Sequence, residues 1–107
     1  LYQNTGQTDK ALSAHQSVLA IDPNYSPSMF ALGYIYMADI LDFQTALTWF
    51  DRVIQLDEKN AAAYLNRGYC YEQLGIKNKA SSDYHRALNL QPNFQKAVEA
   101  LQRIGEK

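Results

Sequence analysis

Residues 33–46 read GYIYMADILDFQTA and residues 68–80 read GYCYEQLGIKNKA, so a Gly-Tyr-x-Tyr opening and a later alanine occur twice in the chain. Twelve residues separate the glycine from the alanine in the first copy, and eleven separate them in the second. The excess falls in ADILD, where the other copy has QLGIK with its turn glycine. We interpret the stretches as one unit written twice, the first with a longer, glycine-free corner carrying Ile40 and Leu41.

Downstream of each corner the chain repeats a pattern of three residues. An alanine is followed four residues later by an aromatic residue or histidine, and three residues after that by a small or β-branched residue. Spacings of four and three place these residues on one face of a helix. The three copies are Ala11, His15 and Val18; Ala46, Phe50 and Val53; and Ala80, Tyr84 and Ala87.

A second helical stripe precedes two of these trios. It consists of Met29, Leu32, Gly33 and Tyr36, and again of Tyr64, Arg67, Gly68 and Tyr71. Each unit is therefore two short amphipathic helices, and neither helix is stable in water without packing. Asp22-Pro23-Asn24 and Gln91-Pro92-Asn93 end helices, and Ser26 before Pro27 predicts an N-cap. We expect helices at 8–21, 27–40, 43–56, 61–74, 77–90 and 94–105, and no strands.

The composition excludes several classes of protein. The chain has 107 residues, of which 47% are apolar and 20% are charged, a profile typical of a folded domain rather than a disordered segment. Its net charge is −1 with both signs interspersed, so we expect no nucleic-acid partner. No apolar run approaches the roughly 20 residues that a membrane-spanning helix needs, so we expect no membrane insertion. The single cysteine excludes an internal disulfide and leaves the localisation undetermined.

The repeated residues resemble the tetratricopeptide repeat family, whose pattern is W-x2-L-G-x2-Y, then A-x3-F, then P, with a period of 34. The third unit has Tyr64-x2-Arg67-Gly68-x2-Tyr71, Ala80-x3-Tyr84 and Pro92, and the second unit has Glu58 where proline is usual. The first unit keeps only Tyr2, Ala11-x3-His15 and Pro23, as if the chain opened inside a helix. The resemblance implies an all-α, right-handed α-solenoid of stacked antiparallel helix pairs. We divide it into a partial repeat (1–25), two repeats (26–60 and 61–94) and a capping helix (95–107).

Two side-chain contacts follow from this alignment. Gly33 and Gly68 lie where the two helices of a unit cross closely, so a side chain there would push the helices apart. Arg67 occupies a position usually filled by leucine, and because a buried charge needs a partner, we predict an ion pair with Asp83. The last helix has Gln102 where a glycine is expected, and we interpret it as a cap, with a further repeat cut short as the alternative.

We find no constellation that would support catalysis or bind a cofactor. Cys70, His15 and His85 are scattered, whereas a zinc site requires about four ligands at close spacing, so no metal site is expected. We interpret Cys70 as a structural core residue, His15 as a hydrogen-bonded core histidine and His85 as solvent-facing. The sequence therefore predicts that the protein is not an enzyme.

The family resemblance implies a concave groove lined by the first helix of each pair. Tyr34 and Tyr69 should face this groove, and Tyr36 and Tyr71 should pack inward. Carried over by position, the groove residues are Phe30, Tyr34, Met37, Leu65, Asn66, Tyr69, Glu72, Gln73, Lys96 and Arg103. The family's clamp for C-terminal carboxylates is disfavoured, because only Asn66 and Lys96 match two of its five positions.

The resulting functional hypothesis is a protein-interaction scaffold that binds a peptide or helix of a protein partner in the groove. The alternative is a structural or oligomerisation segment, which packs against the rest of a longer chain or forms a homo-oligomer through its open N-terminal face. The identity of the partner cannot be inferred from the residues, because a repeat fold leaves the ligand to a few groove positions.

Overall fold

The computed structural model describes residues 6–105, and every regular element among them is a helix. The elements are α1 (Gly6–Ile21), α2 (Ser26–Tyr34), the π-helix η1 (Ile35–Ile40), α3 (Phe43–Leu56), α4 (Ala61–Gln73), α5 (Lys77–Leu90) and α6 (Gln95–Arg103). The expected all-α solenoid is confirmed. Tyr2 and the expected opening of the chain inside a helix lie outside the described residues.

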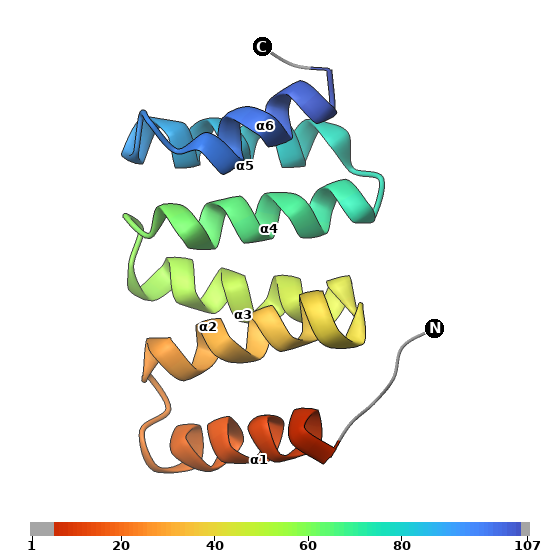
Figure 1. Cartoon of the computed structure of the whole chain (residues 1–107). Coiled ribbons are helices and arrows are strands. Elements are labelled where there is room, and N and C mark those ends of the chain that lie inside the picture. The colour runs from red at the N-terminus through yellow and green to blue at the C-terminus, as the bar shows by residue number, and fades with distance from the viewer. Residues whose placement is uncertain (1–5, 106–107) are drawn as a thin grey trace.

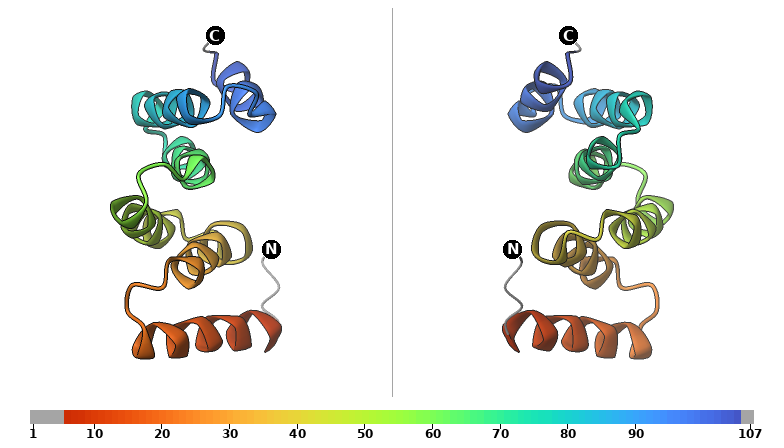
Figure 2. Two further views of the ribbon diagram at one scale, coloured as in Figure 1. Left: turned by 90° about the vertical axis from the view of Figure 1, so that its left-hand side faces the viewer. Right: turned by 90° about the vertical axis from the view of Figure 1, so that its right-hand side faces the viewer.

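The helices stack one above another into an elongated body (Figure 1). From α2 onward they form two layers, with α2, η1, α4 and α6 in one and α3 and α5 in the other (Figure 2). Within the first layer, α4 is set back from η1 and α6, which leaves a concave face (Figure 2). In the same views α1 runs across the direction of the other helices, and none of its residues is buried.

Most helix ends lie where the sequence predicts them. The ranges of α3 and α5 coincide with the expected 43–56 and 77–90, and both proline turns end a helix. Asp42 caps α3 by accepting a hydrogen bond from the Thr45 amide at 3.1 Å. The prediction of Ser26 as an N-cap is wrong. Ser26 is already helical and Tyr25 is the capping residue, because the Asp22–Tyr25 turn delivers the chain into the helix one residue earlier.

The two central glycines lie at close helix crossings, as predicted. A Cβ atom added to Gly33 would lie 2.9 Å from the Phe50 ring, and one added to Gly68 would lie 2.8 Å from the Tyr84 ring. Both rings are fully buried. Each pair of helices is therefore held together by an aromatic ring packed on a bare stretch of backbone.

The expected ion pair between Arg67 and Asp83 is also confirmed. Arg67 donates from Nε to Asp83 at 2.8 Å and from a second nitrogen at 2.9 Å, and it reaches Asp51 at 3.0 Å. Arg86 donates to the same Asp83 carboxylate at 2.9 Å. Asp83 is only 1% exposed, and a buried carboxylate is costly unless it is paired. The guanidinium groups of Arg67 and Arg86 compensate its charge. The hydrogen bonds that Arg67 donates to Asp83 and, to a smaller extent, to Asp51 raise the pKa of the Arg67 guanidinium.

The first trio departs from its two counterparts. Ala46, Phe50 and Val53 are buried, as are Ala80, Tyr84 and Ala87, but Val18 is exposed and Ala11 and His15 are only half-buried. His15 is hydrogen-bonded through Nδ1 to the Ser28 hydroxyl at 3.1 Å, as expected of a satisfied histidine. The sequence pattern identifies which face of α1 points toward α2. The residues on that face stay partly exposed because, within the described residues, α1 packs against α2 and η1 on one side only.

The extra residue of the second unit does not lengthen the corner, so that prediction is wrong. The non-helical corner consists of Leu41 and Asp42, against three residues, Leu74 to Ile76, in the next unit. The insertion lies in η1 instead. There the Tyr36 carbonyl accepts from the Asp42 amide at 2.8 Å, whereas the equivalent bond of the next unit spans one residue fewer, from the Ile76 amide to Tyr71 at 2.9 Å. The helix absorbs the residue as π-turns.

Candidate functional site

The concave face carries a groove of about 540 Å³ between η1 and α6, with α4 as its floor. This volume lies in the range of small-ligand sites in proteins. The lining residues are Tyr34, Met37, Ala38 and Leu41 on one wall, Leu65, Asn66 and Tyr69 on the floor, and Lys96, Glu99, Ala100 and Arg103 on the other wall, with Tyr84 behind them. Seven of the ten predicted groove residues are in this set.

The tyrosines alternate along each first helix as the sequence predicts. Tyr34 is 51% exposed and Tyr69 is half-buried, and both line the groove. Tyr36 and Tyr71 do not line the groove and pack against the buried clusters around Phe50 and Tyr84, the first of which Tyr69 also contacts. The alternation arises because residues two apart on a helix point to different faces.

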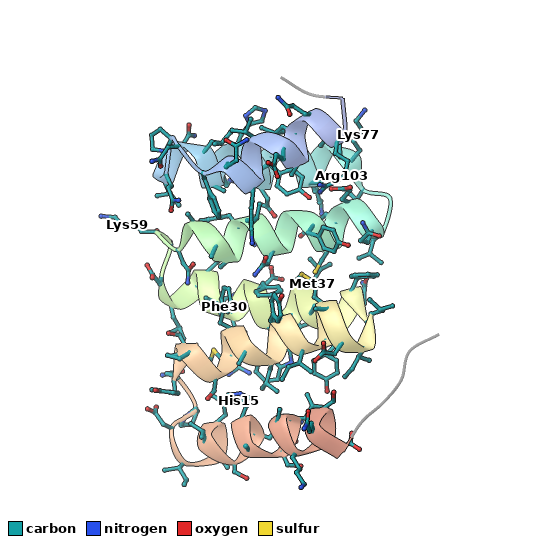
Figure 3. The ribbon with its side chains drawn as sticks, viewed as in Figure 1. His15, Phe30, Met37, Lys59, Lys77 and Arg103 are labelled. Atoms are coloured by element: carbon teal, nitrogen blue, oxygen red, sulfur yellow. The ribbon has the colours of Figure 1, made fainter. Side chains whose placement is uncertain are left out.

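The wall formed by the end of α2, by η1 and by Leu41 after it is uncharged and mostly apolar. Tyr34, Met37, Ala38 and Leu41 contribute no charged group to it. Met37 is nearly buried and packs against Ala46, Phe50 and Cys70, so it supports the wall and only its edge reaches the groove. Figure 3 shows Met37 between η1 and α4, on the same face of the molecule as Arg103.

The opposite wall is charged and partly internally paired. Arg103 donates from two nitrogens to the Glu72 carboxylate, each at 2.8 Å, and its guanidinium lies 5.9 Å from the centre of the Tyr69 ring. Tyr84 donates its hydroxyl hydrogen to Glu72 at 2.6 Å. The bond from Arg103 lowers the pKa of the Glu72 carboxyl, whereas burial raises the pKa of the Tyr84 phenol. Glu72 is therefore ionised and ties α6 to α4.

Two polar groups of the groove have no partner among the described residues. The Lys96 ammonium forms no ion pair, and the Asn66 side chain forms no hydrogen bond there. Within the described range, Glu99 accepts one side-chain hydrogen bond, which Gln95 donates at 3.3 Å, and forms no ion pair. The Lys96 ammonium and the Asn66 amide are therefore available to bind a polar group of a ligand, opposite the uncharged wall that contains Met37 and Leu41.

Three predicted residues lie elsewhere. Phe30 lines a separate pocket of about 380 Å³ with Ser26, Pro27, Asn60 and Ala62, and its ring packs edge-to-face on Phe50 at 5.5 Å. Glu72 stands behind the groove in its pairing with Arg103, and Gln73 is exposed and lines neither pocket. Conversely, the predicted set of ten lacks five lining residues, which are Ala38, Leu41, Tyr84, Glu99 and Ala100. The sequence did contain a signal for Leu41, because it is a leucine at the position where the next unit has the turn glycine Gly75.

Two of the residues considered for reactivity or metal binding, Cys70 and His85, differ in burial, since one lies in the core and one on the surface. Cys70 is fully buried, and burial raises the pKa of its thiol to about 12, so the thiol stays neutral. His85 is exposed, as expected. Among residues 6–105, no three side chains of the His, Cys, Asp and Glu types come together as metal ligands. No helix within that range has the length and apolarity to cross a bilayer.

The repeats match known family models. Residues 42–75 match the model described as "TPR repeat", and residues 61–94 match the one described as "Tetratricopeptide repeat". Similar curated proteins include the general transcriptional corepressor ssn6 of Schizosaccharomyces pombe, 30% identical over 75% of this chain. Subunit 3 of the anaphase-promoting complex from the same organism is 29% identical over 87% of this chain. The chain spans 7% and 14% of these relatives, respectively.

Solved structures agree with this assignment. The Arabidopsis OM64 TPR domain superposes with a TM-score of 0.87 at 25% identity, covering 94% of this chain and 82% of that one. The first TPR of Spaghetti (RPAP3), bound to the HSP90 peptide SRMEEVD, gives 0.87 at 25% identity, covering 92% and 78%. YrrB, described as a TPR protein with an unusual peptide-binding site, gives 0.82 at 25% identity, covering 91% and 50%.

Proposed function

We propose that this chain, which belongs to the tetratricopeptide repeat family, is a protein-interaction module that binds an extended peptide segment of a protein partner in the groove between η1 and α6. The observation that carries the proposal is the combination, in one groove, of half-exposed tyrosines with an unpaired cation and amide. Aromatic side chains at contact surfaces supply large apolar area at little cost in conformational entropy.

The chemistry of the two walls favours a segment that carries both apolar and acidic side chains. An apolar side chain fits the uncharged wall that η1 provides, and a carboxylate fits Lys96 and Asn66 on the other side. Arg103 is already paired with Glu72 and is not free to bind a second carboxylate without losing that contact. A single groove cation without an ion pair among residues 6–105 selects one acidic group rather than a run of them.

The bound segment in this proposal is internal to its partner rather than a C-terminal tail. The RPAP3 domain mentioned above is bound to a peptide ending in Glu-Val-Asp, but this chain has Phe30 and Tyr34 where the family's carboxylate clamp has polar groups, and Ala100 where it has a basic one. The side chains of Phe30, Tyr34 and Ala100 carry no positive charge that could compensate a terminal carboxylate.

Binding without catalysis completes the proposal. The groove has an ammonium and an amide but no activated nucleophile or paired carboxylates of the kind that acid–base chemistry requires. We also retain, as proposals, the division into a partial repeat (1–25), two repeats (26–60 and 61–94) and a capping helix (95–107), and a partner that is a protein rather than nucleic acid.

A selection from a random library of twelve-residue displayed peptides tests this function. We expect enriched peptides to bind the wild-type chain and to bind Tyr34→Ala and Tyr69→Ala at least about tenfold more weakly, the size expected for loss of one aromatic contact. Tyr25→Ala is the matched control, because Tyr25 is 45% exposed but lies outside the groove. Binding should be measured by fluorescence anisotropy with the enriched peptides.

Charge gives a second arm of the same experiment. Lys96→Glu should weaken binding of acidic peptides, whereas Lys59→Glu, at the exposed turn before α4, should leave it unchanged. If no peptide is enriched, and light scattering instead shows a mass that grows with protein concentration, the peptide-binding function is overturned in favour of the oligomerisation alternative.

A further inference from the structure

We propose that Leu41 determines the specificity of the groove, by forming with Tyr34 and Ala38 a subsite for one bulky apolar side chain of the bound peptide. This inference rests on the proposed peptide-binding function and adds the residue that discriminates between peptides. The corresponding position in the next unit is Gly75, so only the second unit carries such a side chain.

The backbone of Leu41 is the first observation. Leu41 lies in the left-handed region with φ 63° and ψ 30°, and it is the only non-glycine residue with positive φ between residues 6 and 105. Gly75, which ends α4 in the same way, has φ 81°. A leucine is disfavoured in this conformation, where a glycine meets no steric penalty. The side chain at this position therefore opposes the local backbone preference.

Burial does not explain why a leucine is there. The Leu41 residue is 56% exposed, so the folded chain gains little apolar burial in return for the unfavourable backbone. Residues in sparsely populated backbone conformations cluster at active sites and ligand clamps. The exposed side chain lies on the lining of the groove, where a ligand would cover it.

The π-helix explains how the subsite is formed. Between Tyr36 and Asp42 the chain has five residues, against four between Tyr71 and Ile76, although the same carbonyl and amide are bonded in both units. The added residue widens the last turn of η1 and brings Leu41 to the groove, where Ala38 also lines it. π-turns inside helices occur frequently at functional sites.

The surroundings select the chemical class of the occupant. The three subsite residues are exposed and uncharged, and the nearly buried Met37 lines the same wall of the groove. All charged residues that line the groove (Lys96, Glu99 and Arg103) come from α6 on the opposite wall. The occupant is therefore a peptide side chain of the leucine, isoleucine, phenylalanine or methionine type, with its acidic neighbour turned toward Lys96.

The displayed dodecamer library tests this subsite directly. Selection on the wild-type chain should enrich peptides with a bulky apolar residue at one fixed distance from an acidic residue. Leu41→Gly should bind those peptides about tenfold more weakly, the change expected when one buried apolar contact is lost. Selection on Leu41→Gly should no longer enrich the apolar position. Leu74→Gly is the control, because this exposed leucine lies at the other corner and outside the groove.

A second variant separates binding from folding. Leu41→Asn retains a residue that tolerates the left-handed conformation but makes the subsite polar, so we expect it to remain helical by circular dichroism and to lose the same apolar preference. If both variants bind the wild-type peptides with unchanged affinity and preference, the inference about Leu41 is wrong and the peptide-binding function stands. If the wild-type chain enriches no peptide, both are overturned.

Discussion

The hairpin of α2, η1 and α3 and the hairpin of α4 and α5 share the same glycine, alanine and aromatic positions, but different side chains join their helices. The first has Leu32 and Trp49 where the second has Arg67 and Asp83. The first ends its leading helix with a leucine and the second with a glycine. The repeat therefore fixes where two helices cross, whereas the residues beside the crossing can be apolar, as in the first hairpin, or an ion pair, as in the second.

The largest effect is expected from breaking the ion pair. Asp83→Leu leaves the Arg67 guanidinium, with a side chain only 16% exposed, without its bidentate partner and with the 45% exposed Asp51 as its remaining carboxylate. It should lower the free energy of unfolding by about 3 kcal/mol, the lower end of the range for a broken buried pair. The double variant Arg67→Leu/Asp83→Leu, which copies the apolar solution of the first hairpin, should recover most of that loss. Urea unfolding followed by circular dichroism measures both. Equal destabilisation in the single and double variants would show that the pair is not the cause.

A smaller effect should distinguish the two helix crossings. Gly68→Ala should lower the free energy of unfolding by about 1 to 3 kcal/mol through overpacking, and Gly33→Ala should lower it less. The Tyr84 ring facing Gly68 is held by its hydrogen bond to Glu72, whereas the Phe50 ring facing Gly33 has no polar tether and can shift. Thermal melting of the two variants side by side gives the order. A larger loss in Gly33→Ala would contradict the role of the tether.

The smallest effect concerns Glu72, which occupies the position of Met37 in the first hairpin. Its lowered pKa means that the folded state favours the carboxylate, so the contribution to stability is present above about pH 4.5 and is lost as the pH falls below it. Because the Arg103 side chain is half exposed, we expect Glu72→Gln to cost less than about 1 kcal/mol at pH 7.

Two urea titrations of that variant, at pH 7 and pH 3, check the sign. The difference between wild type and Glu72→Gln should be smaller at pH 3 than at pH 7, because the contribution of the Glu72 carboxylate decreases as the pH falls below about 4.5. Glu99→Gln, which removes a carboxylate with no ion pair, is the matched control and should show no such change. A difference that persists at pH 3 would assign the effect to packing rather than to charge.

Much of the groove could be predicted because its floor and α6 wall follow helical spacing. Leu65, Asn66 and Tyr69 on α4 and Lys96 and Arg103 on α6 project to one side of helices whose limits the sequence marks clearly. The same spacing could not show that Arg103 would bind Glu72 from another helix. That pairing depends on how far α6 lies from α4, which no local pattern specifies.

The helices, their order, the close crossings at Gly33 and Gly68 and the partner of Arg67 could all be inferred from the residues alone, because each follows from periodicity, steric size or the need to compensate a buried charge. The position of the extra residue of the second unit depends instead on how the helices pack. The amino-acid sequence ADILD is compatible both with a longer non-helical corner and with a π-helix. The π-helix keeps Ile35 and Met37 buried against their neighbours while it brings Leu41 to the groove, and that choice depends on packing between segments distant in the chain.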